Sequence, residues 1–149
     1  MSYHALLYHI IFRPHKNKPV ITEQYERDLY AYINALVRKK GYVLHRINSM
    51  PDHIHLLISL PPSACISDFV RDLKIATHSF MKNNKDKFPH FEKWAESFAV
   101  LSYSMGQKDT VYNYIKNQKE HHKRISFADE LRNLLEEEGI PYNEHFFLA

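Results

Sequence analysis

The sequence predicts an α+β fold in which strands and helices follow one another in the order β-α-β-β-α-β. Runs rich in β-branched and aromatic residues, typical of strands, alternate with longer runs in which apolar residues recur at helical spacing. Two of the strand-like runs are separated only by the turn-forming pair Pro51-Asp52, and so short a connection makes neighbouring strands antiparallel. With 149 residues, 44% of them hydrophobic, the chain is long enough to bury a core.

The first half of the chain supplies a strand, a helix and the two strands joined by the turn. Residues 3–14 are rich in Tyr, Ile and Leu and end at a proline, as a buried strand does. Residues 22–40 carry apolar side chains three or four positions apart and stop before a glycine, which predicts a helix. Residues 42–49 and 53–60 are the second and third predicted strands.

The second half adds a helix, the fourth strand and two further helices. After a Pro-Pro break, Ser67 begins an amphipathic helix, and residues 98–104 form the fourth strand after the polar, irregular residues 83–96. Residues 109–124 and 126–138 are predicted helices beyond the sheet. The order matches the ferredoxin-like unit with additional C-terminal helices, in which two helices cover one sheet face and leave the other free to bind a ligand. This fold alone does not select a function.

Composition indicates a single soluble domain. We expect one domain over residues 1–149, with a core over 3–124 and a C-terminal helix and tail over 125–149. Cys65 is the only cysteine, which excludes an intrachain disulfide and favours the reducing cytoplasm. No segment approaches the roughly 18 apolar residues of a membrane span, so no membrane partner is expected. The formal net charge of +3 permits nucleic-acid binding without arguing for it.

His53 and His55 are the strongest candidates for a metal site. Side chains alternate along a strand, so both imidazoles project from one face while Ile54 and Leu56 point toward the core. Because they follow the turn, they lie at a sheet end where a ligand can reach them. The chain has 11 histidines, so such a pair is expected roughly once by chance. Other residues must therefore complete the site, or the pair is merely exposed.

The helix that follows the fourth strand brings a phenol and an amide together. Tyr114 and Gln118 are four positions apart, so their side chains are neighbours on the helix surface. Alone, this spacing indicates only surface or groove packing, because it occurs freely in helices. His4 and His9 of the first strand fall on opposite faces, which argues against a shared ligand role.

Taken together, the histidine pair after its Pro-Asp turn and the Tyr114-to-Gln118 spacing resemble the single-tyrosine HUH transposases of small insertion sequences. That family includes TnpA-like and REP-associated tyrosine transposases, and the resemblance runs from the first strand through Arg124. It implies a homodimeric DNA transposase that cuts and rejoins single-stranded DNA beside hairpins at transposon ends. The cut strand would be held as a 5′-phosphotyrosine, and active sites can be composite between subunits. The motifs are Met50-Pro51-Asp52-His53-Ile54-His55 and Tyr114-x-x-x-Gln118.

The resemblance also implies roles for individual residues. His53, His55 and Gln118 would bind a divalent cation, Mg²⁺ or Mn²⁺, and Tyr114 would be the nucleophile. No nucleotide cofactor is expected, because a chain with three glycines has no phosphate-binding glycine loop. A ligand set without a carboxylate suits Mn, Co, Ni or Zn better than Mg, so substrate phosphate and water would have to supply the missing oxygens.

Alternatives remain open within the site. Tyr112 is a second possible nucleophile, although two positions back on the helix it points away from Gln118. His121 or His122 could replace Gln118 as a ligand. Contacts to DNA are expected from basic residues, namely Arg13, Lys16, Arg46, Arg71 and Lys74.

Two other function classes also fit the sequence. The first is a non-catalytic module that binds single-stranded RNA or DNA by stacking bases on aromatic side chains of the sheet. The second is a hydrolase for a small substrate, in which the histidine pair holds a zinc-bound water.

Overall fold

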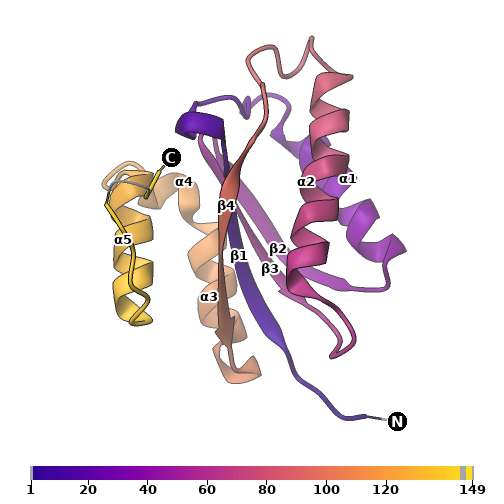
Figure 1. Cartoon of the computed structure of the whole chain (residues 1–149), viewed down its shortest axis with the longest axis vertical. Coiled ribbons are helices and arrows are strands. Elements are labelled where there is room, and N and C mark those ends of the chain that lie inside the picture. Colours follow the sequence, from indigo (N-terminus) through magenta and orange to yellow (C-terminus); the bar gives the residue numbers. More distant parts are fainter. Residues whose placement is uncertain (1, 145–146, 149) are drawn as a thin grey trace.

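The computed structural model describes residues 2–144 and 147–148. Four strands form one antiparallel sheet in the order β2-β3-β1-β4 (Figure 1). The predicted α+β, ferredoxin-like architecture with additional C-terminal helices is therefore confirmed. The elements are β1 (Leu7–Pro14), η1 (His15–Asn17), α1 (Glu26–Lys39), β2 (Val43–Met50), β3 (His53–Ser59), α2 (Ile66–Lys82), β4 (Trp94–Tyr103), η2 (Met105–Gln107), α3 (Lys108–Lys116), α4 (Gln118–His121) and α5 (Phe127–Glu137).

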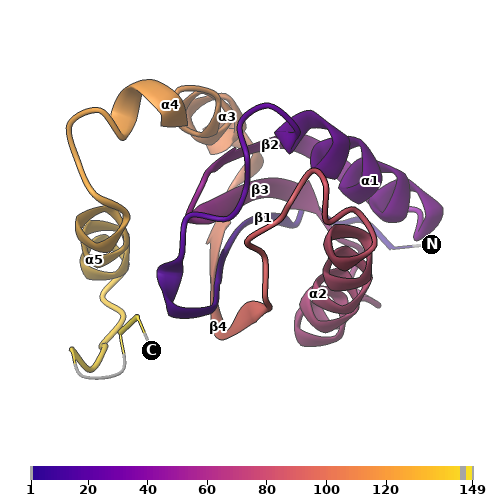
Figure 2. The same cartoon turned by 90° about the horizontal axis from the view of Figure 1, so that it is seen from above.

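One face of the sheet and helices α1 and α2 enclose the main core (Figure 2). Strand β3 contributes alternate residues to it, so Ile54, Leu56 and Ile58 are fully buried there. The helices contribute their apolar stripes, for example Ile33 of α1 and Leu73 of α2, both 0% exposed. This layer follows directly from the period-two and helical patterns of the sequence.

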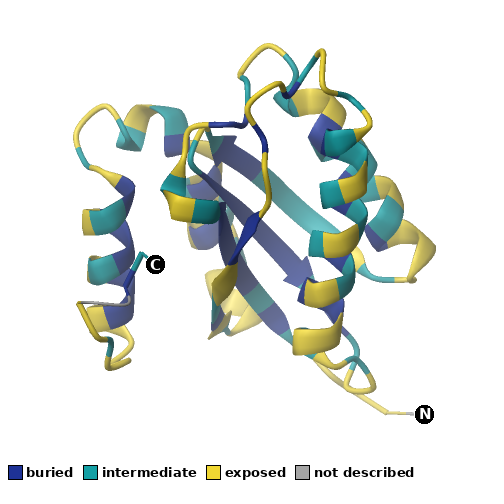
Figure 3. Cartoon of the chain, turned by 45° about the horizontal axis from the view of Figure 1, so that its top comes forward, coloured by how far each residue is buried: buried dark blue, intermediate teal, exposed yellow. Residues whose placement is uncertain are grey.

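The second face of the sheet is covered as well, so the prediction that it is free to bind a ligand is wrong. Val111 and Ile115 of α3 pack against Leu7 and Leu57 of the sheet. Helix α5 packs its apolar stripe against the β1 and β4 side of the same face, beside α3 (Figure 2). Coloured by burial, the middle of the sheet is buried, and exposed residues lie on the helices, the loops and the N-terminal segment (Figure 3). The C-terminal helices thus turn a potential binding surface into a second interior.

Several element boundaries differ from the prediction. Strand β1 begins at Leu7 rather than residue 3, and α1 begins at Glu26 rather than residue 22. Strand β4 begins at Trp94 rather than residue 98, since the Trp94 indole N–H donates to Oγ1 of Thr77 at 2.9 Å and Lys74 donates to the Ala95 carbonyl at 2.8 Å. The helix predicted over residues 109–124 is divided at Asn117, whose φ of −94° and ψ of 17° separate α3 from α4. The two contacts at the start of β4 join residues that are 17 and 21 positions apart in the sequence.

Within residues 2–144 and 147–148, no helix has the length and apolar character that crossing a bilayer requires. The assignment of the whole chain to one domain stays a prediction.

We expect Leu73→Ala to lower the free energy of unfolding by about 2–5 kcal/mol, because it leaves a cavity in the main core. Urea denaturation followed by circular dichroism measures this. The matched control is Ile75→Ala on the same helix, where the side chain is 61% exposed and the change should stay within about 0.5 kcal/mol. Equal losses in the two variants would contradict the assignment of the core face of α2.

Candidate active site

His53 and His55 project from β3 into the second interior of the fold. In the sheet register His55 lies opposite Ile11 of β1 and Asn48 of β2, while His53 lies opposite Met50 at the turn. Both imidazoles are 0% exposed. The prediction placed them on one strand face, where they are, but it also expected an accessible sheet end. The structure buries them instead, beneath side chains of α4 and α5.

Three imidazole rings of this site are each held through Nδ1. His53 Nδ1 lies 2.7 Å from Oδ1 of Asp52, and His55 Nδ1 lies 2.7 Å from Nε2 of His9. His122, which follows α4, has its Nδ1 2.8 Å from the carbonyl oxygen of Ile125. Each partner can accept a hydrogen bond from Nδ1, and in that tautomer Nε2 carries a lone pair for a metal, whereas in the other tautomer Nε2 donates a hydrogen bond.

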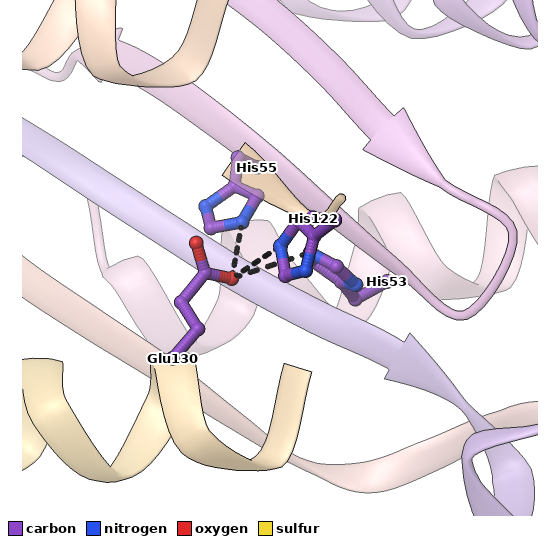
Figure 4. A group of neighbouring side chains, drawn as sticks. All are labelled: His53, His55, His122 and Glu130. Carbon is purple, nitrogen blue, oxygen red and sulfur yellow. Dashed lines mark hydrogen bonds and ion pairs between the residues drawn. The ribbon is translucent and has the colours of Figure 1, made fainter. Parts of the chain in front are cut away.

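The Nε2 atoms of these rings converge on Glu130 of α5 (Figure 4). Its Oε1 lies 3.3 Å from His53, 3.2 Å from His55 and 3.1 Å from His122. The residue is 1% exposed. Its other oxygen, Oε2, accepts a hydrogen bond from the Tyr114 hydroxyl and one of 2.8 Å from the Gln118 amide.

This set of side chains fits a divalent cation. The possible ligand atoms of His53, His55, His122 and Glu130 all lie within 4.8 Å of one another. Imidazole nitrogen and carboxylate oxygen are the common protein ligands of divalent metals. Gln118 lies at the edge of the same set, with Oε1 3.3 Å from Nε2 of His53.

The charges of the site are set by burial and by mutual hydrogen bonds. Burial alone would raise the pKa of Glu130, but hydrogen bonds from His122, His53 and His55 outweigh it and hold that pKa well below its usual range. Burial also lowers the pKa of His55, to about 4. For His53 burial acts in the same direction, yet hydrogen bonds to Asp52 and Glu130 raise its pKa above the ordinary value. At neutral pH the site therefore contains a carboxylate beside a neutral His55.

Tyr114 lies on α3 with its ring 6.1 Å from the ring centroids of both His9 and His55. Burial and the negative charge of Glu130 raise its pKa, so the side chain is a phenol at neutral pH. It borders a cavity of about 320 Å³ that is also lined by residues of α5, including Glu130 and Glu137. The predicted nucleophile and the predicted histidine pair are thus neighbours within one chain.

Tyr112 borders a different space, a groove of about 660 Å³ formed by residues of α1, β2, α3 and α4. Its hydroxyl accepts a hydrogen bond of 3.4 Å from Arg46, whose guanidinium also lies 5.5 Å from the ring centroid. The groove is lined by further basic side chains, Arg27, Lys116 and Lys119. Tyr112 therefore belongs to a basic groove and not to the histidine cluster.

The five basic residues predicted to contact DNA do not form one surface. Arg46 lines the basic groove, and Lys16 is exposed in η1. Arg13 is 3% exposed and donates to Ser97 and to the backbone near the C-terminus. Arg71 pairs with aspartates of its own helix, and Lys74 donates to backbone carbonyls at the start of β4.

Sequence reasoning missed Glu130, His9 and Asp52. For Glu130 a signal existed, because it occupies the position between Phe127 and Leu131 in the buried stripe of α5, where an apolar residue is expected. His9 was set aside because it does not share a face with His4, yet it holds His55 instead. Asp52 was regarded only as a turn residue.

We expect acidification from pH 6.5 to about 4.5 to destabilise the metal-free protein, because burial lowers the pKa of His9 and His55. The unfolded chain binds protons on these residues in that range and the folded chain does not, so stability falls as pH falls. Each group contributes up to about 1.4 kcal/mol per pH unit.

Urea denaturation in EDTA at several pH values measures this slope. His9→Gln should make it shallower, because it removes one of the two buried imidazoles. An unaltered slope in His9→Gln would show that His9 does not contribute.

The chain is similar to known transposases over most of its length. A family model described as "Transposase IS200 like" matches residues 2–118. The ISDra2 transposase TnpA of Deinococcus radiodurans is 28% identical over 119 residues, which are 77% of this chain and 85% of that protein. The transposase of insertion sequence element IS200 from Salmonella typhimurium is 25% identical over 120 residues, 78% of each chain.

Solved structures agree with these matches. A crystal structure from Deinococcus radiodurans R1, described as a transposase, has a TM-score of 0.62 at 28% identity and covers 78% of this chain and 93% of its own. A REP-associated tyrosine transposase bound to a REP hairpin shares the fold, with a TM-score of 0.60 at 16% identity over 84% of this chain and 76% of its own. The family that the sequence motifs resemble is confirmed, and the chain belongs to the IS200-like transposases.

Proposed function

We propose that this transposase cuts and rejoins single-stranded DNA beside hairpins through a 5′-phosphotyrosine on Tyr114, with Mg²⁺ or Mn²⁺ bound at His53 and His55. One observation supports this assignment above all. The Tyr114 hydroxyl and the two imidazoles contact the same carboxylate, that of Glu130, so nucleophile and cation ligands share one small site. Gln118, the third ligand implied by the motif, contacts the same carboxylate.

The reaction requires the protein to align the Tyr114 oxygen with the phosphorus and to accept the proton of the Tyr114 hydroxyl. The oxygen of Tyr114 attacks phosphorus as the bond to the 3′ oxygen breaks, which leaves a 5′-phosphotyrosine and a free 3′-OH after the leaving oxygen takes up a proton. The tyrosine proton already points to Oε2 of Glu130. Attack by the 3′-OH of another strand reverses these changes and reseals the DNA without ATP. A bound cation supplies positive charge that stabilises the charge developing on the phosphate.

The electrostatics of the site explain why a cation is needed. The pKa of Tyr114 is raised, which disfavours the nucleophilic phenolate. The cavity beside it is lined by two carboxylates, Glu130 and Glu137, which repel a phosphate. Positive charge at the histidine cluster offsets both effects.

The basic groove is the proposed path for DNA. Arg27, Arg46 and Lys116 line it and form no ion pair within the described part of the chain, so their charges are available to phosphates. Arg46 Nη1 donates to the Tyr112 hydroxyl, which holds the guanidinium at the wall of the groove. The ring of Tyr112 adds a surface on which a base can stack. The structural neighbour solved with a REP hairpin supports hairpin DNA as the partner.

The alternative of a sheet-face nucleic-acid binder lacks the surface it requires, because α3 and α5 cover that face. The predicted homodimer with composite sites stays a prediction. Within one chain, the ring of Tyr114 already lies 6.1 Å from that of His55.

We expect the protein to form a covalent adduct with a labelled hairpin oligonucleotide that carries a single-stranded flank, in the presence of Mn²⁺ or Mg²⁺. A denaturing gel should show a band shifted by one protein mass. EDTA and Tyr114→Phe should each abolish the band because they remove the cation and the nucleophile. Tyr112→Phe is the matched control and should retain it. An adduct that persists in Tyr114→Phe would disprove this nucleophile, and hydrolysis of small phosphodiesters by that variant would favour a metal hydrolase.

Charge removal in the basic groove should weaken DNA binding at every sequence. For Arg46→Ala and for Lys116→Ala, in a Tyr114→Phe background, we expect the slope of log affinity against log salt to fall by about 1 each. Fluorescence anisotropy at several salt concentrations measures it. Arg71→Ala should change the slope less, because Asp68 and Asp72 lie 3.2 and 3.4 Å from that guanidinium. If Arg71→Ala changed the slope more than the groove variants did, the DNA path would instead run along α2.

A further inference from the structure

We propose that His122 and Glu130 join His53 and His55 as cation ligands in place of Gln118, and that this set selects Mn²⁺ or a similar transition ion over Mg²⁺. The inference rests on the proposed function, whose motif names only the histidine pair and Gln118. Both added residues lie beyond residue 118, where the match to the family model ends.

The first step is the convergence of three ring nitrogens. Nε2 of His53, of His55 and of His122 lie within 3.1–3.3 Å of a single point, now held by Oε1 of Glu130 (Figure 4). Three imidazole edges and one carboxylate edge thus face one another. A hydrogen-bonded cluster built only for stability has no need to point three ring nitrogens at one place, whereas a metal site does.

The second step is the orientation of the rings. A histidine ligand usually donates its second ring nitrogen to an acceptor, which fixes the tautomer that can bind metal. His53, His55 and His122 each have such an acceptor on Nδ1, namely the Asp52 carboxylate, His9 Nε2 and the Ile125 carbonyl.

His121 lacks this support and is the weaker candidate. No group among the described residues holds its Nδ1, and its side chain is 32% exposed. Its Nε2 lies 3.3 Å from Oε2 of Glu130 without forming a hydrogen bond. The side chain of His122 is 5% exposed by comparison.

The third step concerns Glu130 and Gln118. A carboxylate that is 1% exposed is costly to bury unless it is paired or binds a metal. Packing of Phe127 and Leu131 against the sheet keeps α5 in place and holds this carboxylate inside. The Gln118 amide donates to Oε2 at 2.8 Å while its own oxygen lies 3.3 Å from Nε2 of His53, so Gln118 holds the carboxylate from the edge of the cluster.

The donor set then predicts the metal. Mg²⁺ prefers six oxygen ligands and gives up water reluctantly, so three imidazoles suit it poorly. Imidazole with one carboxylate suits later divalent ions, whose affinities exceed that of Mg²⁺ at nitrogen sites. The carboxylate missing from the motif is supplied by Glu130.

Calorimetric titration of the full-length protein with MnCl₂ or MgCl₂, without DNA, tests the inference. We expect Mn²⁺ to bind more tightly than Mg²⁺ by at least roughly tenfold. His122→Asn keeps a donor for the Ile125 carbonyl but removes Nε2, and Glu130→Gln keeps the shape but removes the charge. Each should weaken Mn²⁺ binding by at least about tenfold, because even removal of an outer partner costs that much. The matched control His121→Asn should change it less than about threefold.

A second measurement uses the unmodified protein, so a variant that fails to fold does not decide the matter. In crystals soaked with MnCl₂, the anomalous signal should place the ion in contact with Nε2 of His122 and an oxygen of Glu130. An ion held by His53, His55 and Gln118 alone would overturn the inference, as would Mn²⁺ affinity unchanged in both variants. A cation bound by the four residues without any DNA adduct on Tyr114 would disprove the proposed function and leave this inference standing.

Discussion

The buried carboxylate of Glu130 is the interaction on which the second interior of this protein depends. An isolated carboxylate in an apolar interior costs many kcal/mol, and only its partners make the burial possible. Here the partners come from β3, α3 and α4 and the residue that follows α4, while the carboxylate itself comes from α5. The contact therefore fixes how the C-terminal helices sit on the sheet, in addition to the apolar packing of α5.

The covering of the second sheet face by the C-terminal helices removes the surface on which a ferredoxin-like sheet could bind a ligand. In such folds one sheet face is commonly open, and a flat ligand can lie on it. Here α3 and α5 cover that face, which leaves a small cavity beside Tyr114 and a larger polar groove along β2. Separate spaces for a reacting bond and for a charged strand suit an enzyme that must grip DNA away from the point of attack. The family match shows an IS200-like transposase, and the two separate spaces are compatible with the proposed reaction site and DNA path.

The sequence predicted those features that depend on local pattern. The strands and amphipathic helices followed from periods of two and of about 3.6 residues, and the histidine pair and the Tyr114-to-Gln118 pair followed from the same periods. The irregular segment predicted over residues 83–96 includes the first residues of β4, because the contact of Trp94 with Thr77 spans 17 residues and leaves no local pattern. The pairing of His9 with His55 spans 46 residues and that of His55 with Glu130 spans 75. No local periodicity in the sequence can predict contacts between residues so far apart in the chain. Of these residues, only Glu130 is indicated by the sequence pattern, as a charged residue within the apolar stripe of α5.

Glu130 contacts both the proposed nucleophile, Tyr114, and the proposed cation ligands. A change in the charge of this carboxylate therefore affects both. One of its oxygens faces three imidazoles and the other accepts the Tyr114 proton. Negative charge on this carboxylate raises the pKa of Tyr114, so whatever draws that charge toward the histidines also lowers the cost of forming phenolate. The same carboxylate is held in place by α5, whose apolar side packs against the sheet. A substitution in that apolar contact, distant from every reacting atom, therefore acts on the acidity of the nucleophile and on the cation site at once.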